Sequence, residues 1–220
     1  MRTFVKVINS ASRRTDISAF YSRWLINRIR AGFCSVPNPY NPSRISQVSL
    51  KPERVEAIVF WPKNPAPLMV HLDELDLRGF HYYFLITLNN YPSALETNLP
   101  LLEERLNIFL RLSDCVGPIR VIWRYDPIII SNMTSLDVHR RNFEEITRRL
   151  EGSTKRVIIS FCDFCRKTER RLSALANEGY RFQRDAACSP EAKNMLRDIA
   201  TMAKNGGMEI MTCAGCVGVL

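Results

Sequence analysis

The sequence lacks a long hydrophobic run, and this absence argues against a conventional membrane-spanning helix. No stretch approaches the roughly 18 uncharged apolar residues that crossing a bilayer requires. Residues 1–8 already carry Arg2 and Lys6 among strand-like residues, so the N-terminus does not resemble a secretory signal. We therefore expect a cytoplasmic protein that has no membrane partner.

Several motifs of well-known enzyme classes are also missing. The chain has no glycine-rich dinucleotide or phosphate-binding loop, no nucleophile elbow and no kinase motif. Its three histidines show no H-x-x-x-H spacing and none follows a predicted strand, so acid–base chemistry centred on histidine has little support. The seven cysteines are an odd number in a fairly long chain, which favours reduced thiols or metal ligands over a disulfide framework.

The chain has an excess of positive charge. Its formal net charge is +9 and its isoelectric point is about 9.4. A positive field of this kind suits a nucleic acid or an anionic small molecule as the partner. A solvated basic surface without such a role is the alternative interpretation.

Apolar runs of strand length alternate with longer segments of helical periodicity, and this alternation is the main indication of the fold. Predicted strands cover residues 4–8, 55–61, 82–88, 119–123, 157–161 and 208–212, and predicted helices cover 18–31, 66–77, 99–112, 136–150, 165–178 and 190–204. Residues 33–36 and 45–50 predict an additional strand pair joined by a proline-rich turn. Strands that are apolar along most of their length are typical of a parallel sheet covered by helices.

The pattern predicts an α/β fold in a single domain over residues 1–220. We expect a TIM-like (β/α) barrel, incomplete, with about six to seven βα units. A doubly wound open sheet is the alternative, although no glycine-rich motif supports it. In both architectures ligands bind beyond the carboxyl ends of the strands.

Polar residues do gather directly after the predicted strands. The substrate-binding candidates are Arg13, Arg14, Lys63, Asn64, Arg124 and Lys167, and the catalytic candidates are Asp16, Asp126 and Asp163. Two adjacent guanidinium groups ahead of a helix suit a carboxylate or a phosphate. A helix cap at Thr15 or Asp16 with the arginines solvated, and a structural turn around Lys63, are the competing interpretations.

Arg124 and Asp126 form the most specific polar pair in the chain. Strand alternation places the two side chains on one face, about 7 Å apart. If that face is buried, the two charges must pair or bind a ligand. A structural salt bridge at the end of the strand is the alternative.

Two C-x-x-C pairs follow the last two predicted strands. They consist of Cys162 and Cys165, and of Cys213 and Cys216, with 47 residues between the pairs. Strands that end at the same edge would let the four thiols converge on zinc or on an iron–sulfur cluster. Unrelated thiols without a metal are the alternative.

Four motifs together resemble the bacterial family DUF1848, a domain of unknown function. They are SASRRTD at residues 10–16, FWPKNP at 60–65, WRYDP at 123–127, and Ser160-Phe161 followed by Asp163, Lys167 and Thr168. The resemblance implies a TIM-like barrel and an enzyme related to radical S-adenosylmethionine and spore-photolyase-like proteins, with S-adenosylmethionine as the analogous cofactor. The family typically continues into a cysteine-rich tail that this sequence lacks, so Cys213 is the one thiol that the resemblance transfers as a ligand.

Three functional hypotheses follow. In the first, an enzyme binds an anionic substrate at the strand ends through the candidates named above. In the second, a nucleic-acid-binding protein without catalysis uses the basic helix exteriors, namely Arg140, Arg141, Arg148, Arg149, Arg166, Lys167, Arg170 and Arg171. In the third, the two cysteine pairs hold a structural metal. Oligomeric state does not follow from the sequence.

Overall fold

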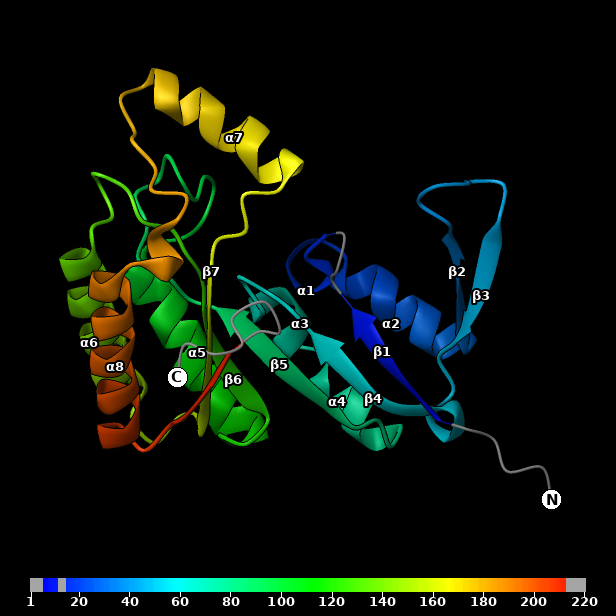
Figure 1. The fold of residues 1–220 in the computed structure, drawn as a ribbon. Coiled ribbons are helices and arrows are strands. Elements are labelled where there is room, and N and C mark those ends of the chain that lie inside the picture. The colour runs from blue at the N-terminus through cyan, green and yellow to red at the C-terminus, as the bar shows by residue number, and fades with distance from the viewer. Residues whose placement is uncertain (1–5, 12–14, 213–220) are drawn as a thin grey trace. The chain divides into compact units, whose positions relative to one another are not determined.

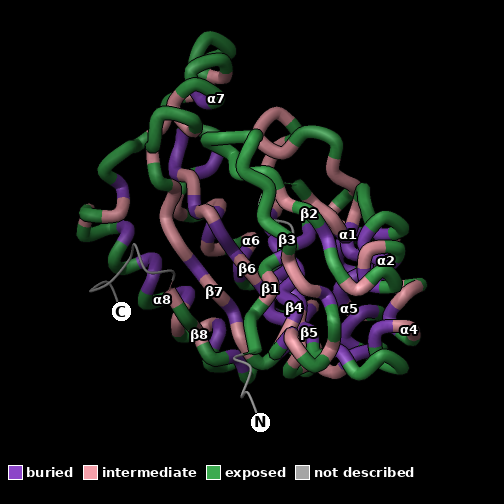
Figure 2. The backbone as a smooth tube through the Cα atoms, turned by 90° about the vertical axis from the view of Figure 1, so that its right-hand side faces the viewer, coloured by how far each residue is buried: buried purple, intermediate pink, exposed green. Residues whose placement is uncertain are grey.

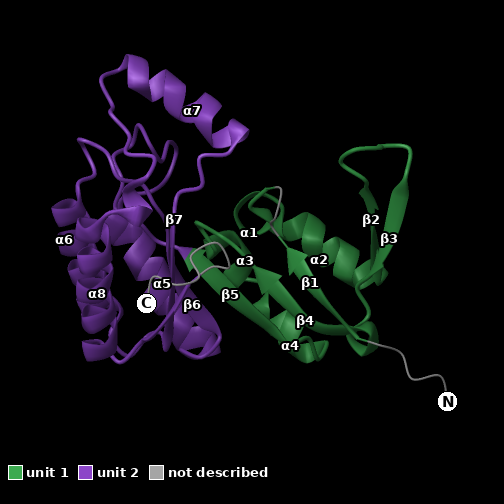
Figure 3. Ribbon diagram, viewed as in Figure 1, with its two compact units in different colours: residues 1–86 green, residues 87–220 purple. Residues whose placement is uncertain are grey.

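The structure, a computed structural model, describes residues 6–11 and 15–212. It is a mixed α/β protein whose strands and helices are shown in Figure 1. The chain divides into two compact units, residues 1–86 and 87–220 (Figure 3). Six strands form parallel sheet, in the order β1-β4-β5 in the first unit and β6-β7-β8 in the second.

In the first unit, short helices surround three parallel strands and one hairpin. The parallel strands are β1 (Val7–Ala11), β4 (Val55–Phe60) and β5 (Tyr82–Thr87). The last residue of β5, Thr87, is the first residue of the second unit. The hairpin pairs β2 (Phe33–Pro37) with β3 (Ile45–Ser49). The helices are α1 (Ile17–Phe20), α2 (Ser22–Ala31), α3 (Ala66–Met69) and α4 (Leu72–Leu77), with a 3-10 turn at Pro52–Arg54.

The core of the first unit follows from its apolar pattern. β4 is buried from Ile58 to Phe60, and the rings of Phe60 and Phe84 on the neighbouring strand stack at 5.1 Å. Helix α2 buries one face and ends at Gly32, whose φ of 78° is the left-handed conformation that glycine adopts readily.

The second unit contains three parallel strands and four helices. The strands are β6 (Val121–Ile128), β7 (Arg156–Phe161) and β8 (Glu209–Thr212), and the helices are α5 (Leu102–Val116), α6 (Leu136–Leu150), α7 (Arg166–Asn177) and α8 (Pro190–Asn205), with a 3-10 turn at Ala186–Cys188. Helix α6 packs against α5 and α8.

Helix α6 illustrates how the sequence specifies this unit. The hydroxyl of Ser135 caps its start by accepting a hydrogen bond from the Val138 backbone N–H. Its buried stripe carries Phe143, whose ring stacks on that of Trp123 in β6 with the centroids 4.7 Å apart. The bounds predicted from periodicity, 136–150, are therefore confirmed.

Helix α7 is different, because most of its residues are exposed (Figure 2). Leu172 is its one buried residue. It lies beyond the end of β7, away from α6 and α8 (Figure 1).

The predicted alternation of strands and helices is confirmed with shifted bounds. The predicted helices 18–31 and 66–77 are each divided into two, as α1 with α2 and as α3 with α4. The predicted strand 119–123 is wrong at its end, because β6 continues through Arg124 and Asp126 to Ile128. Their mutual ion pair removes the cost of placing either charge inside a buried strand.

The predicted incomplete TIM-like barrel is not shown, since no sheet of the described residues is closed. The single-domain organisation stays a prediction. Among the described helices, none combines the length and the apolar composition that crossing a membrane needs.

A buried polar network ties α6 to the end of β6. His139 Nε2 lies 3.0 Å from the carbonyl oxygen of Ile129, which can only accept, so Nε2 carries the proton in the neutral ring. His139 Nδ1 then accepts from the Tyr125 hydroxyl at 2.8 Å. Burial lowers the pKa of His139, which favours this neutral form.

This network predicts an acid-sensitive stability. Because burial lowers the pKa of His139 in the folded state, the unfolded state binds a proton more readily. The free energy of unfolding should fall as the pH drops below about 6.5, the ordinary pKa of histidine. Urea unfolding at several pH values should show this fall, and His139→Gln should make the profile flatter between about pH 7 and 5. If the pH dependence of the free energy of unfolding is the same in His139→Gln as in the unaltered protein, His139 is not the group responsible.

Candidate functional site

The carboxyl end of β6 is held by side chains of the segment that follows β5. The Tyr91 hydroxyl donates to the carbonyl of Pro127 at 2.6 Å and accepts from the Ile129 N–H at 2.9 Å. The Asn89 amide donates to the carbonyl of Asp126 at 3.2 Å. We call these contacts the β6 clamp. They pair backbone groups that would otherwise be buried without partners where β6 leaves regular pairing.

The segment that supplies the β6 clamp is itself anchored to α5. Arg105 donates to the carbonyl of Asn89 at 2.8 Å and forms a buried ion pair with Glu96 at 3.4 Å. Burial lowers the pKa of the Arg105 guanidinium, and the Glu96 carboxylate opposes this shift. The chain from Asn89 to Glu96 is thus fixed at both ends.

The end of β6 in turn positions the start of the loop after β7. Ile128 pairs with Phe161, and the Ile128 carbonyl accepts from the Cys162 N–H at 2.9 Å. The peptide bond between Asp126 and Pro127 is cis. Pro127, Ile129 and Cys162 are therefore held side by side at the carboxyl ends of neighbouring strands.

Arg124 and Asp126 form an ion pair, as their alternation on one strand face predicted. The two side chains are only 18% and 9% exposed. In this largely buried setting each charge needs the other, because an unpaired buried charge is strongly destabilising. The pair is a structural salt bridge in this structure, and its role toward a substrate stays a prediction.

A pocket of about 790 Å³ lies between these strand ends and α7. We call it the α7 pocket. It is lined by Ala94, Leu95, Thr97, Pro127, Ile129, Cys162, Lys167, Thr168, Arg171, Leu172, Ala174 and Leu175. Its lining thus combines apolar walls with two cations, two hydroxyls and a thiol, and no carboxylate is among the described residues that line it. A site of this size and composition is typical of small-molecule binding.

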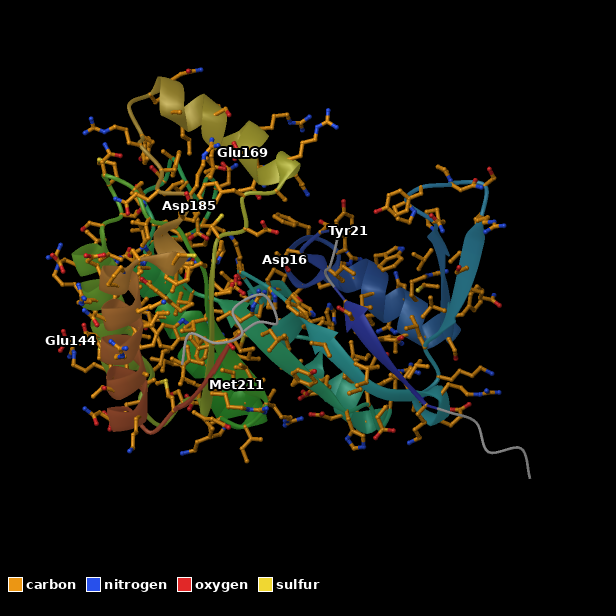
Figure 4. The ribbon with its side chains drawn as sticks, in the orientation of Figure 1. Asp16, Tyr21, Glu144, Glu169, Asp185 and Met211 are labelled. Carbon is orange, nitrogen blue, oxygen red and sulfur yellow. The ribbon has the colours of Figure 1, made fainter. Side chains whose placement is uncertain are left out.

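The two cations of the α7 pocket lie one helical turn apart on α7. Lys167 and Arg171 have the i, i+4 spacing that places side chains on one helix face. Neither forms an ion pair with any residue in the part of the chain that the structure describes. The nearest acidic residue in the sequence, Glu169, is labelled in Figure 4. It forms an ion pair with Arg184 at 2.8 Å. No described carboxylate therefore neutralises the positive charge of the pocket.

Two thiols with opposite electrostatic surroundings lie beside the pocket. Burial, and then the negative charges of Asp163, Cys165 and Asp126, raise the pKa of Cys162 to about 11. Cys165 is exposed and precedes α7, where the Thr168 hydroxyl and the backbone N–H groups of Thr168 and Lys167 lower its pKa. Cys165 is accordingly the more readily ionised thiol.

The first unit brings two predicted site residues together. Asp16 caps α1 through a 3.0 Å hydrogen bond from the Ala19 N–H, and its second carboxylate oxygen accepts from the Lys63 N–H at 2.8 Å. Burial raises the pKa of Asp16, and these N–H groups oppose that shift. Asn64 accepts from the Ala66 N–H at 3.1 Å as α3 begins. Asp16 is therefore a helix cap, and residues 63–66 form a structural turn, as in the alternative interpretation. A substrate role of these residues stays a prediction.

Not every predicted site residue can be located. Arg13, Arg14, Cys213 and Cys216 lie outside the described residues, so the four-cysteine metal site stays a prediction. Among residues 6–11 and 15–212, no group of three or more histidine, cysteine, aspartate or glutamate side chains is placed to hold a metal ion. The described residues therefore do not by themselves fit a zinc ion or an iron–sulfur cluster.

Comparison with known proteins gives a family. The family model described as "Domain of unknown function (DUF1848)" matches residues 8–218, almost the whole chain. The chain belongs to the DUF1848 family. Neither a curated protein nor a solved structure matches it. Within this DUF1848 protein the four motifs that suggested the family lie in both units, and the β6 clamp holds one of them, residues 123–127.

Sequence reasoning did not find every residue that this site uses. Arg171 was assigned only to a basic helix exterior, although its spacing from Lys167 would have placed both on one face. Tyr91 was not recognised, because a tyrosine in an irregular segment carries no periodic signal. The role of Tyr91 is visible only in the structure, where its hydroxyl binds the Pro127 carbonyl and the Ile129 N–H.

The β6 clamp predicts that Tyr91→Phe destabilises the protein. The substitution keeps the ring but leaves the Pro127 carbonyl and the Ile129 N–H of the DUF1848 chain without their partner. A buried polar group without a partner costs about 1–3 kcal/mol in the free energy of unfolding. Urea denaturation measures the loss, with Tyr40→Phe as control because Tyr40 is 95% exposed. Equal stability of the two variants would contradict the clamp.

Proposed function

We propose that this DUF1848 protein is an enzyme that binds a small anionic substrate in the α7 pocket. The observation that supports the proposal most directly is the charge of the lining, because Lys167 and Arg171 are present and no described residue of the lining is a carboxylate. Position supports it as well, because ligands of parallel α/β sheets bind beyond the carboxyl ends of the strands.

The chemistry of the lining indicates the class of substrate. Lysine and arginine bind carboxylate, phosphate or sulfonate groups through charge-assisted hydrogen bonds. The apolar walls formed by Leu95, Ile129 and Leu175 suit an apolar body behind that group. The Arg171 guanidinium can donate two parallel hydrogen bonds to such an anionic group, whereas the Lys167 ammonium group acts as a point charge. We therefore propose a small molecule that has an anionic head and an apolar body.

The catalytic part of the proposal uses groups at the same strand ends. Asp126 acts on Cys162 electrostatically, which indicates that the Arg124–Asp126 pair lies near the pocket wall. Asp163 is exposed on the adjacent loop. Asp126 and Asp163 are the proposed acid–base groups, and the ion pair with Arg124 holds the Asp126 side chain in position.

The resemblance to radical S-adenosylmethionine and photolyase-like proteins suggests a reaction class but supplies no step here. Since the described residues do not fit a metal cluster by themselves, the proposal draws no chemistry through one. A substrate role of Arg13, Arg14, Lys63, Asn64 or Asp16 in the first unit is a separate prediction.

The aromatic sulfonate 8-anilinonaphthalene-1-sulfonate tests the α7 pocket, because it has an anionic head and an apolar body. Lys167→Ala and Arg171→Ala should each weaken its binding about three- to tenfold, since each removes one charge-assisted contact. Fluorescence titration measures the dissociation constant. Arg170→Ala is the matched control, because Arg170 lies next to Arg171 on α7 but does not line the pocket.

The control separates a pocket from a general attraction to positive charge. The account requires Arg170→Ala to bind the sulfonate as the unaltered protein does. If all three variants weaken binding equally, the probe is responding to net charge and the pocket proposal fails. If none of the three variants weakens binding, the sulfonate binds outside the α7 pocket, and the proposal fails as well.

A second candidate function, nucleic-acid binding, is favoured by one observation on α7. Its exposed cations Arg166 and Arg170, like the two in the pocket, form no ion pair with a described residue. Helix α6 differs in part, because two of its four arginines are neutralised: Arg140 pairs with Asp137 and Asp198, and Arg149 pairs with Glu103. The other two, Arg141 and Arg148, form no ion pair with a described residue. Helix α7 is thus the proposed contact for phosphates.

This second function predicts a salt-dependent affinity that responds to α7. For a fluorescein-labelled oligothymidylate, each lost phosphate contact should reduce the log–log slope of affinity against salt by about 0.7. The double variant Arg166→Ala/Arg170→Ala should therefore show a shallower slope, whereas Arg140→Ala should not. Fluorescence anisotropy at several salt concentrations measures the slopes. The absence of binding at low salt would exclude this function.

A further inference from the structure

Cys162 and Cys165 are adjacent thiols at the corner where β7 leads into α7. Cys162 is half-buried in the wall of the α7 pocket, and its backbone N–H is held by the Ile128 carbonyl. Cys165 is exposed and is the residue immediately before α7. Only Asp163 and Phe164 separate them, and charge on the Cys165 sulfur is felt at Cys162.

Both sulfurs are in the reduced state and neither is held by a strong partner. The Cys165 sulfur lies 3.4 Å from the Thr168 hydroxyl, and the Cys162 sulfur lies 3.8 Å from the Asp163 carbonyl. Neither contact blocks a bond between the two sulfurs. Two cysteines separated by two residues ahead of a helix suit reversible disulfide chemistry.

The other described cysteines lack this arrangement. Cys34 is buried in β2, Cys115 lies within α5, and Cys188 lies in the 3-10 turn before α8. No second cysteine lies within three residues of any of them in the sequence.

We propose that Cys162 and Cys165 are a redox modification site, at which a peroxide converts the two thiols to an intramolecular disulfide. The Cys165 sulfur attacks one peroxide oxygen, the O–O bond breaks, and water leaves as Cys165 becomes a sulfenic acid. The Cys162 sulfur then attacks the Cys165 sulfur, and a second water leaves. The two thiols lose two electrons and two protons, and the peroxide is reduced to two waters.

The disulfide would tie the first turn of α7 to the end of β7. Helix α7 depends on few other attachments, namely buried Leu172 and the ion pair of Glu169 with Arg184. Phe164 lies between the two cysteines in the sequence, and the Arg184 guanidinium is 6.0 Å from the centre of its ring. Oxidation would therefore restrict the segment that carries Lys167 and Arg171. Its effect on ligand binding rests on the proposed function, but disulfide formation does not.

Trypsin gives a direct readout, because cleavage after Arg156 and Arg166 releases residues 157–166, which contain both cysteines and no other. The full chain, purified with a reductant and a chelator, is treated with hydrogen peroxide, alkylated and digested. We expect this peptide to be unalkylated and about 2 Da lighter than its dithiol form. Treatment with dithiothreitol should convert it fully back to the dithiol form. Cys165→Ser should instead leave Cys162 available for alkylation.

Three results would overturn the proposal. They are a peptide 157–166 that stays fully alkylated, a peptide joined by disulfide to another cysteine-containing peptide, and irreversible oxidation of Cys165 while Cys162 remains free. Cys188→Ser is the matched control, because Cys188 is also exposed, and it should leave the 2 Da loss unchanged. Repeating the sulfonate titration on oxidised protein separates the two proposals, since the mass loss can occur whether or not the pocket binds an anion.

Discussion

The requirement that buried backbone groups be paired is the constraint on which the second unit depends. At its carboxyl end β6 departs from regular register between Tyr125 and Ile128, so its polar groups need other partners. Tyr91 and Asn89 supply them. Because the same stretch then receives the Cys162 N–H, one set of side-chain contacts fixes both strand ends that form the wall of the α7 pocket.

Electrostatics separates two kinds of basic surface in this protein. On α6 the arginines at positions 140 and 149 are neutralised by carboxylates of neighbouring helices, so they contribute to packing between helices. On α7 the cations at positions 167 and 171 have no such partners among the described residues and border a concave, partly apolar space. A high net charge alone does not distinguish these cases, but the placement of each charge does.

The sequence was sufficient for the order and type of the main elements, because strand and helix periodicities are local properties. Helix 136–150 was predicted to the residue. The end of β6 was not, because its continuation depends on an ion pair within the strand and on a hydrogen bond from Leu88, neither of which a hydropathy pattern records. An incomplete barrel was expected from the number of repeated units, but repeat number does not determine whether a sheet curls into a barrel, and the described residues form no closed sheet.

For the site, sequence order correctly brought Arg124 and Asp126 together and placed Lys167 near a strand end. It did not find Tyr91 or the pocket role of Arg171, because these depend on tertiary placement. The most direct measurement is a crystal structure of the protein with 8-anilinonaphthalene-1-sulfonate. The account predicts the sulfonate group within hydrogen-bonding distance of Lys167 or Arg171, with the rings against Leu95 and Ile129. A probe bound on another surface, with the α7 pocket filled only by water, would contradict it.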